Sequence, residues 1–476
     1  MRRAIAILAA LGMSCILHAS TPDRAIDAFI AREMPVSGAP GLAYAIVDKG
    51  DIRADARGET LKGSGDAVTP DTPFLLGSVS KSFTAMAVMQ LVEAGKVDLD
   101  TGIGRYLPIF ADAPARDVTL RQLLSHTSGF STLQGNAAHV DDSRSTDALD
   151  RQVTRIATWT PSHAPGTHWE YSNANYLILG ALIERISGQD YASYITAHIL
   201  KPLGMTHSFV SDGAHHPGMA RGHMPWFGGK RAMADAPTGR IMAPAGGVIA
   251  SARDVARYLG VMMNGRDDVI RAQSKAMMMQ PASEASPYYG FGWNIDPDSG
   301  AVYHSGNSPG VETLVSMIPD AQKGAVVLVN AAGGMGFGDT VALRVGIATL
   351  ALGEEYDGPG GNWGPKSLYL AIAITAPLFL IAMVVAWFRR GALRAKSGAF
   401  GRFSLWFPLA ATLAMAWVFV MLIPHLFGTP IANLYRYQPD MTLMLIAGAV
   451  TGVAWALFRL ALGYSGRRGG NVASQD

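Results

Sequence analysis

Apolar residues are distributed unevenly along this chain of 476 residues. In the last quarter they form three long stretches, Leu368–Phe388, Leu405–Phe427 and Met441–Gly463, each close to the roughly twenty residues that cross a bilayer. Upstream, the apolar runs are short and are separated by polar turns, as in a water-soluble domain. A buried hairpin is the alternative for such stretches, but three of them so close together favour a folded domain followed by three membrane-spanning helices.

The shorter runs upstream predict an antiparallel sheet. Candidate strands are residues 41–48, 52–56, 301–305, 311–318 and 324–330. Lys49-Gly50 forms the turn of the first hairpin, and the helix-favouring residues from Ser82 to Leu91 predict a helix that ends near Gly95. We expect an α/β (α+β) fold with an antiparallel sheet flanked by helices and a mostly helical lobe, followed by three transmembrane helices.

Changes in composition divide the chain into five segments. Arg2-Arg3 followed by the apolar stretch Ala4–Leu17 is typical of a secretory signal peptide. Glycine and proline are concentrated just before the first long apolar stretch, which indicates a linker. The expected segments are a signal peptide (1–20), a folded domain (21–355), a linker (356–366), a three-helix membrane domain (367–464) and a tail (465–476).

Basic residues set the orientation of the membrane helices. The first connection between them carries five basic residues from Arg389 to Arg402, whereas the second carries Arg436 alone, and the tail adds Arg467 and Arg468. Because positive residues favour the cytoplasmic side, the first connection and the tail are expected in the cytoplasm. The large domain then lies in the periplasm or outside the cell, held by a bacterial inner membrane, as the signal peptide independently predicts.

Several function classes are disfavoured by the sequence. A net charge of +2 gives no basic surface for nucleic acid. His215, His216 and His223 lack the pattern of a zinc site, so no metal is expected. The glycine-rich segment Gly333–Gly338 lacks the lysine and the spacing of nucleotide-binding loops, and no cofactor is expected.

The clearest candidate chemistry is the sequence Ser78-Val79-Ser80-Lys81 at the start of the predicted helix. Residues three apart share a helix face, so Lys81 would lie beside the Ser78 hydroxyl as an activator beside a nucleophile. Alone, this S-x-x-K pattern is weak, because a helix-capping serine followed by a solvated lysine is common. Two further motifs follow in order, Tyr171-Ser172-Asn173 and His304-Ser305-Gly306.

Together, the three motifs resemble those of the serine β-lactamase and penicillin-binding-protein superfamily. The tyrosine in the second motif and the histidine in the third resemble the class C β-lactamase-related branch. Two other stretches, Leu123–Phe130 and Ala243–Val248, agree with that branch, and the resemblance covers roughly residues 22–350. It implies an acyl-enzyme at Ser78, with Lys81 and Tyr171 as the proton-transfer pair and either one as the formal base.

The resemblance also implies the remaining parts of a site. The N–H groups of Ser78 and Asn307 would form the oxyanion hole, and Gly306 would let the substrate backbone approach. Since a histidine is mostly neutral at pH 7, His304 would make recognition of a substrate carboxylate weaker than the lysine of other branches does. The expected substrate-binding residues are Asn173, His223, His304, Ser305, Gly306 and Asn307.

A competing nucleophile is Ser308, because Gly306–Gly310 matches the G-x-S-x-G elbow of α/β-hydrolases. That elbow requires a backbone N–H after the serine and a helix beyond it. Pro309 has no N–H, and residues 311–319 have the pattern of a strand, so Ser308 is rejected.

The expected function is a membrane-anchored serine peptidase or amidase that acts on acyl-D-amino-acid or related amides. The order of signal peptide, hydrolase domain and three spans resembles prodrug-activating peptidases of the colibactin-maturing type, which remove an N-acyl-D-asparagine group. An esterase or D,D-carboxypeptidase shares every motif and stays open, and a β-lactam-binding or scaffold protein without turnover is the alternative of another class. The expected partners are a small amide or peptide substrate and the lipid bilayer.

Overall fold

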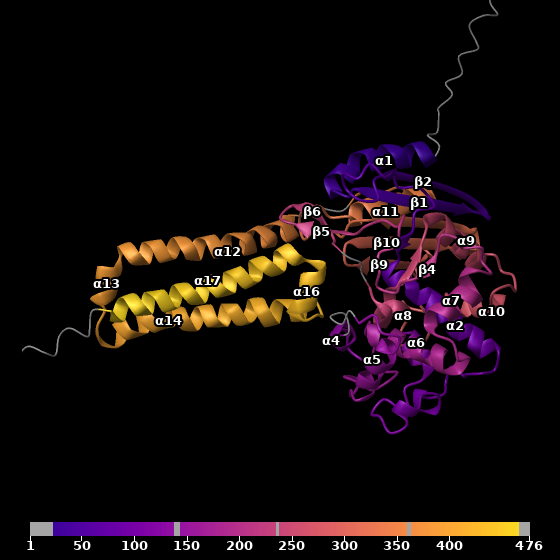
Figure 1. Ribbon diagram of the computed structural model, residues 1–476, viewed down its shortest axis with the longest axis horizontal. Coiled ribbons are helices and arrows are strands. Elements are labelled where there is room, and N and C mark those ends of the chain that lie inside the picture. The colour runs from indigo at the N-terminus through magenta and orange to yellow at the C-terminus, as the bar shows by residue number, and fades with distance from the viewer. Residues whose placement is uncertain (1–21, 138–142, 235–237, 359–362, 466–476) are drawn as a thin grey trace, which may run out of the picture.

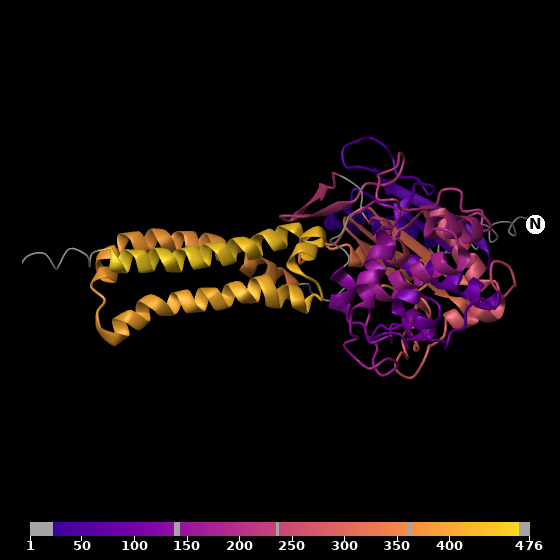
Figure 2. The same ribbon diagram turned by 60° about the horizontal axis from the view of Figure 1, so that its bottom comes forward.

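The structure is a computed structural model that describes residues 22–137, 143–234, 238–358 and 363–465. The predicted signal peptide, and the tail beyond residue 465, lie outside the described residues. A mixed α/β domain stands at one end of the molecule, and three long helices run away from it side by side (Figures 1 and 2).

The main sheet has six strands in the order β2-β1-β11-β10-β9-β8, and every neighbouring pair is antiparallel. The strands are β1 (Gly41–Asp48), β2 (Asp51–Gly58), β8 (Asn294–Ile295), β9 (Val302–Ser308), β10 (Val311–Ile318) and β11 (Lys323–Val329). All five predicted strands are present, and Lys49-Gly50 forms the first hairpin turn with positive φ angles. Because β1 pairs with β11, the two ends of the domain meet at the centre of the sheet.

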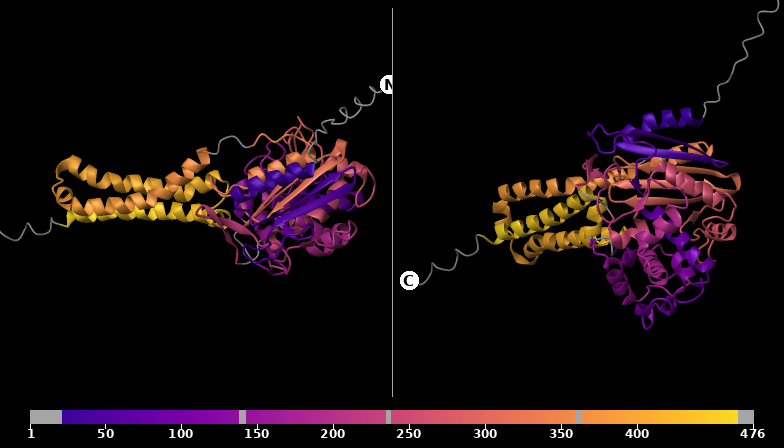
Figure 3. Two further views of the ribbon diagram at one scale, coloured as in Figure 1. Left: turned by 90° about the horizontal axis from the view of Figure 1, so that it is seen from above. Right: turned by 45° about the vertical axis from the view of Figure 1, so that its right-hand side comes forward.

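Helices cover both faces of this sheet. The side chains of Leu42, Tyr44 and Ile46 in β1 pack on one face against α1 (Pro22–Ser37) and α11 (Val341–Leu352), which lie together in Figure 3. Alternate β1 residues point to the other face and join the main core with α2 (Ser80–Glu93) and α9 (Ala252–Met263). The burial of β1 on both faces explains why its sequence is apolar almost without interruption.

The helical lobe is built around α2, nearly all of whose residues are buried. The other helices of the lobe and its edge are α3 (Leu120–Leu124), α4 (Thr132–Asn136), α5 (Ala148–Ala157), α6 (Asn173–Ser187), α7 (Tyr191–Ile195), α8 (Ala243–Gly246), α9 (Ala252–Met263) and α10 (Ala272–Met278), with α2 spanning Ser80–Glu93. Two small sheets complete the domain, β3 (Phe74–Leu75), β4 (Phe209–Val210) and β7 (Val248–Ala250) in one and β5 (His223–Trp226) and β6 (Gly229–Ala232) in the other.

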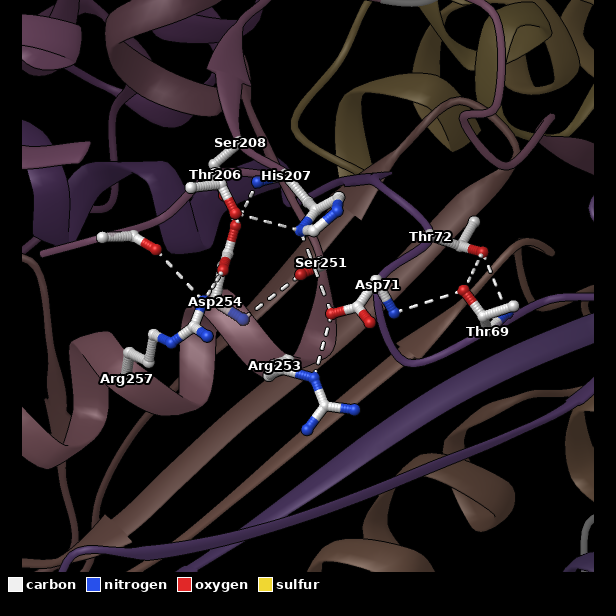
Figure 4. Close-up of polar contacts among 11 residues, drawn as sticks. Thr69, Asp71, Thr72, Thr206, His207, Ser208, Ser251, Arg253, Asp254 and Arg257 are labelled. Carbon is white, nitrogen blue, oxygen red and sulfur yellow. Dashed lines mark hydrogen bonds and ion pairs between the residues drawn. The ribbon is translucent and has the colours of Figure 1, made fainter. Parts of the chain in front are cut away.

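A polar network fixes the start of α9, which follows β7 and the α8 turn (Figure 4). The buried carboxylate of Asp254 accepts hydrogen bonds from the His207 N–H at 2.7 Å and the Ser208 hydroxyl at 2.8 Å. Arg253, one residue earlier, pairs with Asp71 at 2.9 Å. These contacts hold the segment after α8 in place, and α8 supplies a carbonyl to the candidate site described below.

Each of the three long apolar stretches forms a helix that is long and apolar enough to span a membrane. The helices are α12 (Trp363–Phe388), α14 (Gly398–Trp417) continued through a π-helical turn into α15 (Ile423–Leu426), and α17 (Pro439–Tyr464), with the short helices α13 (Arg390–Arg394) and α16 (Ile431–Tyr437) between them. Helix α12 begins at Trp363, within the segment expected to be the linker. Pro365 lies in the first helical turn, where its missing N–H is not needed.

Candidate active site

Ser78 lies in the 3-10 turn η1 (Gly77–Val79), directly before α2, and is half-buried among buried neighbours. The turn packs closely against β9, since a Cβ atom added at Gly77 would lie 2.9 Å from the backbone nitrogen of Asn307. Gly77 also has a φ of +56°, which favours glycine. The glycine therefore lets the serine turn and the end of β9 lie side by side.

Lys81 is fully buried one turn later, on the same side as Ser78. Its Nζ donates to Ser78 Oγ at 3.1 Å and to the Ala245 carbonyl of α8 at 2.7 Å. The rings of Tyr171 and Tyr176 lie 4.9 Å and 5.5 Å away, and no carboxylate of the described residues forms an ion pair with it. Burial lowers the pKa of Lys81 well below its usual value, which favours a neutral amine able to accept a proton.

Tyr171 faces the same pair from the loop before α6. Burial raises the pKa of its phenol, and a contact with the Ser78 hydroxyl offsets only part of that effect. Its hydroxyl has no hydrogen-bond partner of standard geometry among the described residues. Tyr171 is therefore a protonated phenol next to Ser78 and Lys81, with its hydroxyl available to donate or accept a proton.

The geometry of β9 supports an oxyanion hole but changes the role expected for Gly306. A Cβ atom at Gly306 would lie 1.9 Å from the Leu76 carbonyl oxygen, so this glycine faces the serine turn rather than an incoming substrate. It allows the strand to approach the turn, which brings the backbone nitrogen of Asn307 toward Ser78. The side chains of Ser305 and Asn307 lie on the opposite, exposed face of the strand.

His304 is buried in β9 and faces the interior of the site. Its Nδ1–H donates to the Ser305 carbonyl at 2.7 Å, and its Nε2 accepts from the Tyr289 hydroxyl at 3.1 Å. Burial, together with the nearby Lys81, lowers the pKa of His304 to about 3. Its imidazole is therefore neutral at pH 7, and both of its nitrogens already have partners.

Comparisons with known proteins identify the family. The family described as Beta-lactamase matches residues 26–349. The chain belongs to the beta-lactamase family. It is 34% identical over 312 residues to penicillin-binding protein 4 of Amycolatopsis lactamdurans, which covers 61% of this chain and 81% of that protein. The family match agrees with the resemblance expected from the motifs.

Solved structures of the same superfamily confirm the fold. The octameric penicillin-binding protein homologue from Pyrococcus abyssi is 26% identical with a TM-score of 0.61, over 70% of this chain and 77% of that one. The D-alanine carboxypeptidase AmpC from Burkholderia cenocepacia is 25% identical with a TM-score of 0.57, over 70% of this chain and 98% of that one. The superfamily consists generally of serine hydrolases, and its match to this chain ends before the three apolar helices.

His126 lies next to the candidate site of this beta-lactamase family member, although the sequence analysis assigned it no role. Its Nδ1 accepts from the Ser172 N–H at 3.1 Å and lies 3.0 Å from Asn175 Nδ2, and its ring lies 4.3 Å from that of Tyr171. Burial lowers the pKa of His126, so it is neutral and can accept both bonds. Leu123–Phe130 supported the family resemblance, but only the fold shows that this stretch supports Tyr171.

Two of the expected substrate-binding residues, Asn173 and His223, have different surroundings. Asn173 is the first residue of α6 and lies on the same short segment as Tyr171. Its Nδ2 donates to Asn136 Oδ1 at 2.9 Å. His223 is fully buried, its Nδ1–H donates to the Asn330 carbonyl at 2.9 Å, and its Nε2 accepts from the Lys62 N–H at 3.3 Å. These backbone contacts occupy both of its nitrogens.

The rejected alternative nucleophile has the wrong surroundings in the structure. Ser308 is the buried last residue of β9, which turns into strand β10 rather than into a helix.

Among the described residues, His163, His168 and Glu170 form a group whose possible metal-ligand atoms all lie within 4.8 Å of one another. Both histidines are exposed, and Glu170 already accepts a bond from the Thr132 N–H.

Proposed function

We propose that this protein is a membrane-anchored serine hydrolase that cleaves amides through an acyl-enzyme at Ser78. The observation that supports it most strongly is the fully buried Lys81 amine, which lies 3.1 Å from Ser78 Oγ with no carboxylate partner in the described part of the chain. Such a lysine is a usable base near neutral pH, because the low-dielectric surroundings disfavour its charge.

In the acylation step, neutral Lys81 takes the proton of Ser78, and Oγ attacks the carbonyl carbon of the amide. The resulting oxyanion accepts hydrogen bonds from the N–H groups of Ser78 and Asn307, each donor contributing about 10²–10³ in rate. Tyr171 then donates its proton to the leaving nitrogen and recovers one from the Lys81 ammonium as the C–N bond breaks. In deacylation, water gives a proton to Tyr171 while Tyr171 passes its own to Lys81, and the water oxygen attacks the acyl carbon. Lys81 then returns a proton to Ser78 Oγ as the ester bond breaks and the acid is released. The lowered pKa of Lys81 and the raised pKa of Tyr171 favour Lys81 as the first base.

His304 bears on the choice of substrate. Because its imidazole is neutral and both nitrogens are engaged, it offers no cation to a substrate carboxylate. This favours neutral acyl-D-amino-acid amides, the substrate class of the prodrug-activating peptidases that the domain order resembles. The likeness to the Burkholderia D-alanine carboxypeptidase favours a second candidate, a cell-wall carboxypeptidase.

The location follows from the same proposal. The three apolar helices anchor the protein in the bacterial inner membrane, with the basic connection from Arg389 to Arg402 in the cytoplasm. The first span leaves the hydrolase domain on the opposite side, in the periplasm or at the cell exterior. A small amide is then cleaved after export, or before it enters the cell.

The first experiment measures the intact mass of the full-length protein after reaction with a fluorophosphonate, for the wild type and for Ser78→Ala. We expect a single adduct that is absent from the variant. N-acyl-D-amino-acid p-nitroanilides, short-chain esters and D-Ala-D-Ala peptides then separate amidase, esterase and carboxypeptidase activities. An adduct that survives in Ser78→Ala contradicts the assignment, and acylation by penicillin without release supports a protein that does not turn over.

A further inference from the structure

The membrane domain contacts the hydrolase domain beside the candidate site. We call residues 427–438, which link the second and third spans and include α16, the outer connection. Within it, the Gly428 carbonyl accepts from Asn136 Nδ2 at 2.9 Å, and Asn433 Nδ2 lies 3.4 Å from the Asn136 carbonyl. Figure 1 shows α16 at the end of the helical bundle that faces the hydrolase domain, close to α4.

Helix α4, which receives these contacts, also touches the catalytic segment. Asn136 Oδ1 accepts from Asn173 Nδ2 at 2.9 Å, and the Thr132 hydroxyl donates to the Tyr171 carbonyl at 2.7 Å. The packing is tight on the membrane side too, because a Cβ atom at Gly428 would lie 2.9 Å from Thr132 Cγ2. One short helix thus connects the outer connection to two residues of the candidate site.

The outer connection is itself held in a fixed position. Asn433 is buried, and its Nδ2 donates to the buried Thr429 hydroxyl at 2.7 Å. At the start of α17, the buried carboxylate of Asp440 accepts from the Phe227 N–H and the Tyr369 hydroxyl, each at 2.9 Å. The domains are therefore joined by partly buried hydrogen bonds before and after α16, which is more than a tether requires.

We propose that the membrane domain is a working part of the hydrolase site, because the outer connection holds Asn136 and Asn136 orients the Asn173 amide that binds substrate. The proposal rests on the proposed function, in which Asn173 contacts the substrate. Asn433 and Asn136 are positioning residues: they act through Asn173 and do not touch the reacting atoms. Loss of Asn433 should weaken substrate binding and leave the nucleophile unchanged.

The test uses the full chain in lipid nanodiscs with an N-acyl-D-amino-acid p-nitroanilide. Asn433→Leu removes the amide that faces Asn136, and Gln438→Met is the matched control, since Gln438 donates at 2.7 Å to the Gly333 carbonyl rather than to α4. We expect Asn433→Leu to raise KM about fivefold, the equivalent of one ordinary hydrogen bond. Values of kcat and of the fluorophosphonate labelling rate should stay within about twofold, and Gln438→Met should change none of these parameters.

A double-mutant cycle tests whether the effect passes through Asn173. If Asn433 positions Asn173, Asn433→Leu should have no further effect on KM in an Asn173→Ala background. An undiminished effect in that background, equal effects of Asn433→Leu and Gln438→Met, or a loss of labelling in Asn433→Leu would each overturn the proposal.

A readout without turnover separates this proposal from the proposed function. Hydrogen exchange of residues 132–136 and 172–175 should accelerate in Asn433→Leu and remain unchanged in Gln438→Met. If the wild type neither labels nor hydrolyses amides while exchange responds as expected, the proposed function fails and the coupling between the domains stands. Unchanged exchange in Asn433→Leu overturns the coupling whatever the activity.

Discussion

Two buried lysines of the same domain have opposite surroundings. Lys275 in α10 contacts Asp268 Oδ1 at 2.6 Å, the Arg266 carbonyl at 2.8 Å and Asn264 Oδ1 at 3.0 Å. Lys81 in α2 has one carbonyl, one hydroxyl and two aromatic rings around it. The charge of Lys275 is balanced, whereas that of Lys81 is not.

The difference shows how the same side chain takes a structural or a chemical role. At Lys275 the carboxylate compensates for desolvation, so the ammonium links α10 to the preceding loop. At Lys81 no carboxylate of the described residues compensates for desolvation, and burial lowers the pKa of the amine. A lysine whose pKa is lowered by burial costs stability, because folding disfavours its proton, and this one lies beside a hydroxyl that needs a base.

The largest effect is expected from Lys81→Met, which keeps the length and apolar stem of the side chain. Removal of the base should lower the fluorophosphonate labelling rate of Ser78 about 10³-fold. The melting temperature should stay the same or rise, because the variant no longer buries an unbalanced amine. Labelling kinetics and thermal melting of the same preparation measure both quantities, and a variant that loses labelling only because it unfolds would refute this account of Lys81.

Tyr171→Phe should produce the next largest effect. Without its hydroxyl the leaving nitrogen has no proton donor, and we expect kcat for a p-nitroanilide to fall about 10²-fold. Tyr176→Phe is the matched control, because its ring also lies beside Lys81 while its hydroxyl donates to the Leu124 carbonyl at 2.9 Å. Equal losses of kcat in the two variants would argue that both tyrosines act only by packing around Lys81.

These variants also show how far the sequence could predict the site. The spacing of Ser78 and Lys81 predicts their contact, since residues three apart share a helix face. The local sequence does not predict the surroundings of Lys81. Tyr171 was expected beside it only from the family resemblance, and the Ala245 carbonyl reaches it from another distant segment. The partners of His223 could not be predicted either: its polarity indicated substrate binding, whereas its two nitrogens contact the backbone groups of Asn330 and Lys62.

The fold was easier to predict than these contacts. The alternation and length of the apolar runs predict the sheet and the three long helices, because burial on one or two faces leaves a periodic pattern in the sequence. The α16 segment has no such pattern, and its place beside α4 depends on single hydrogen bonds such as that from Asn136 to Gly428. Long-range contacts of this kind have no local signature.

Asp268→Asn should make Lys275 resemble Lys81. The variant leaves a buried ammonium without its carboxylate, and we expect a loss of about 3 kcal/mol in unfolding free energy, or about 10²-fold in the folding equilibrium. The labelling rate of Ser78 in the folded fraction should stay unchanged. Chemical denaturation at pH 7 measures the effect. An unfolding free energy equal to that of the wild type would show that the Asp268 carboxylate does not compensate for the buried ammonium.

The smallest graded effect is that of pH on the wild type. Since the pKa of folded Lys81 is lowered and acylation needs its neutral amine, the labelling rate should rise about tenfold per pH unit and level off before pH 10.5. No break in the labelling rate is expected near pH 6.5, because His304 has a pKa of about 3 and the pKa of His126 is also lowered.

The same shift of Lys81 affects stability. Between its folded pKa and 10.5, Lys81 is protonated in the unfolded chain and neutral in the folded one, so its contribution makes stability increase with pH across that window. Lys81→Met should lack that increase, and a labelling profile that falls as pH rises would instead require a protonated Lys81.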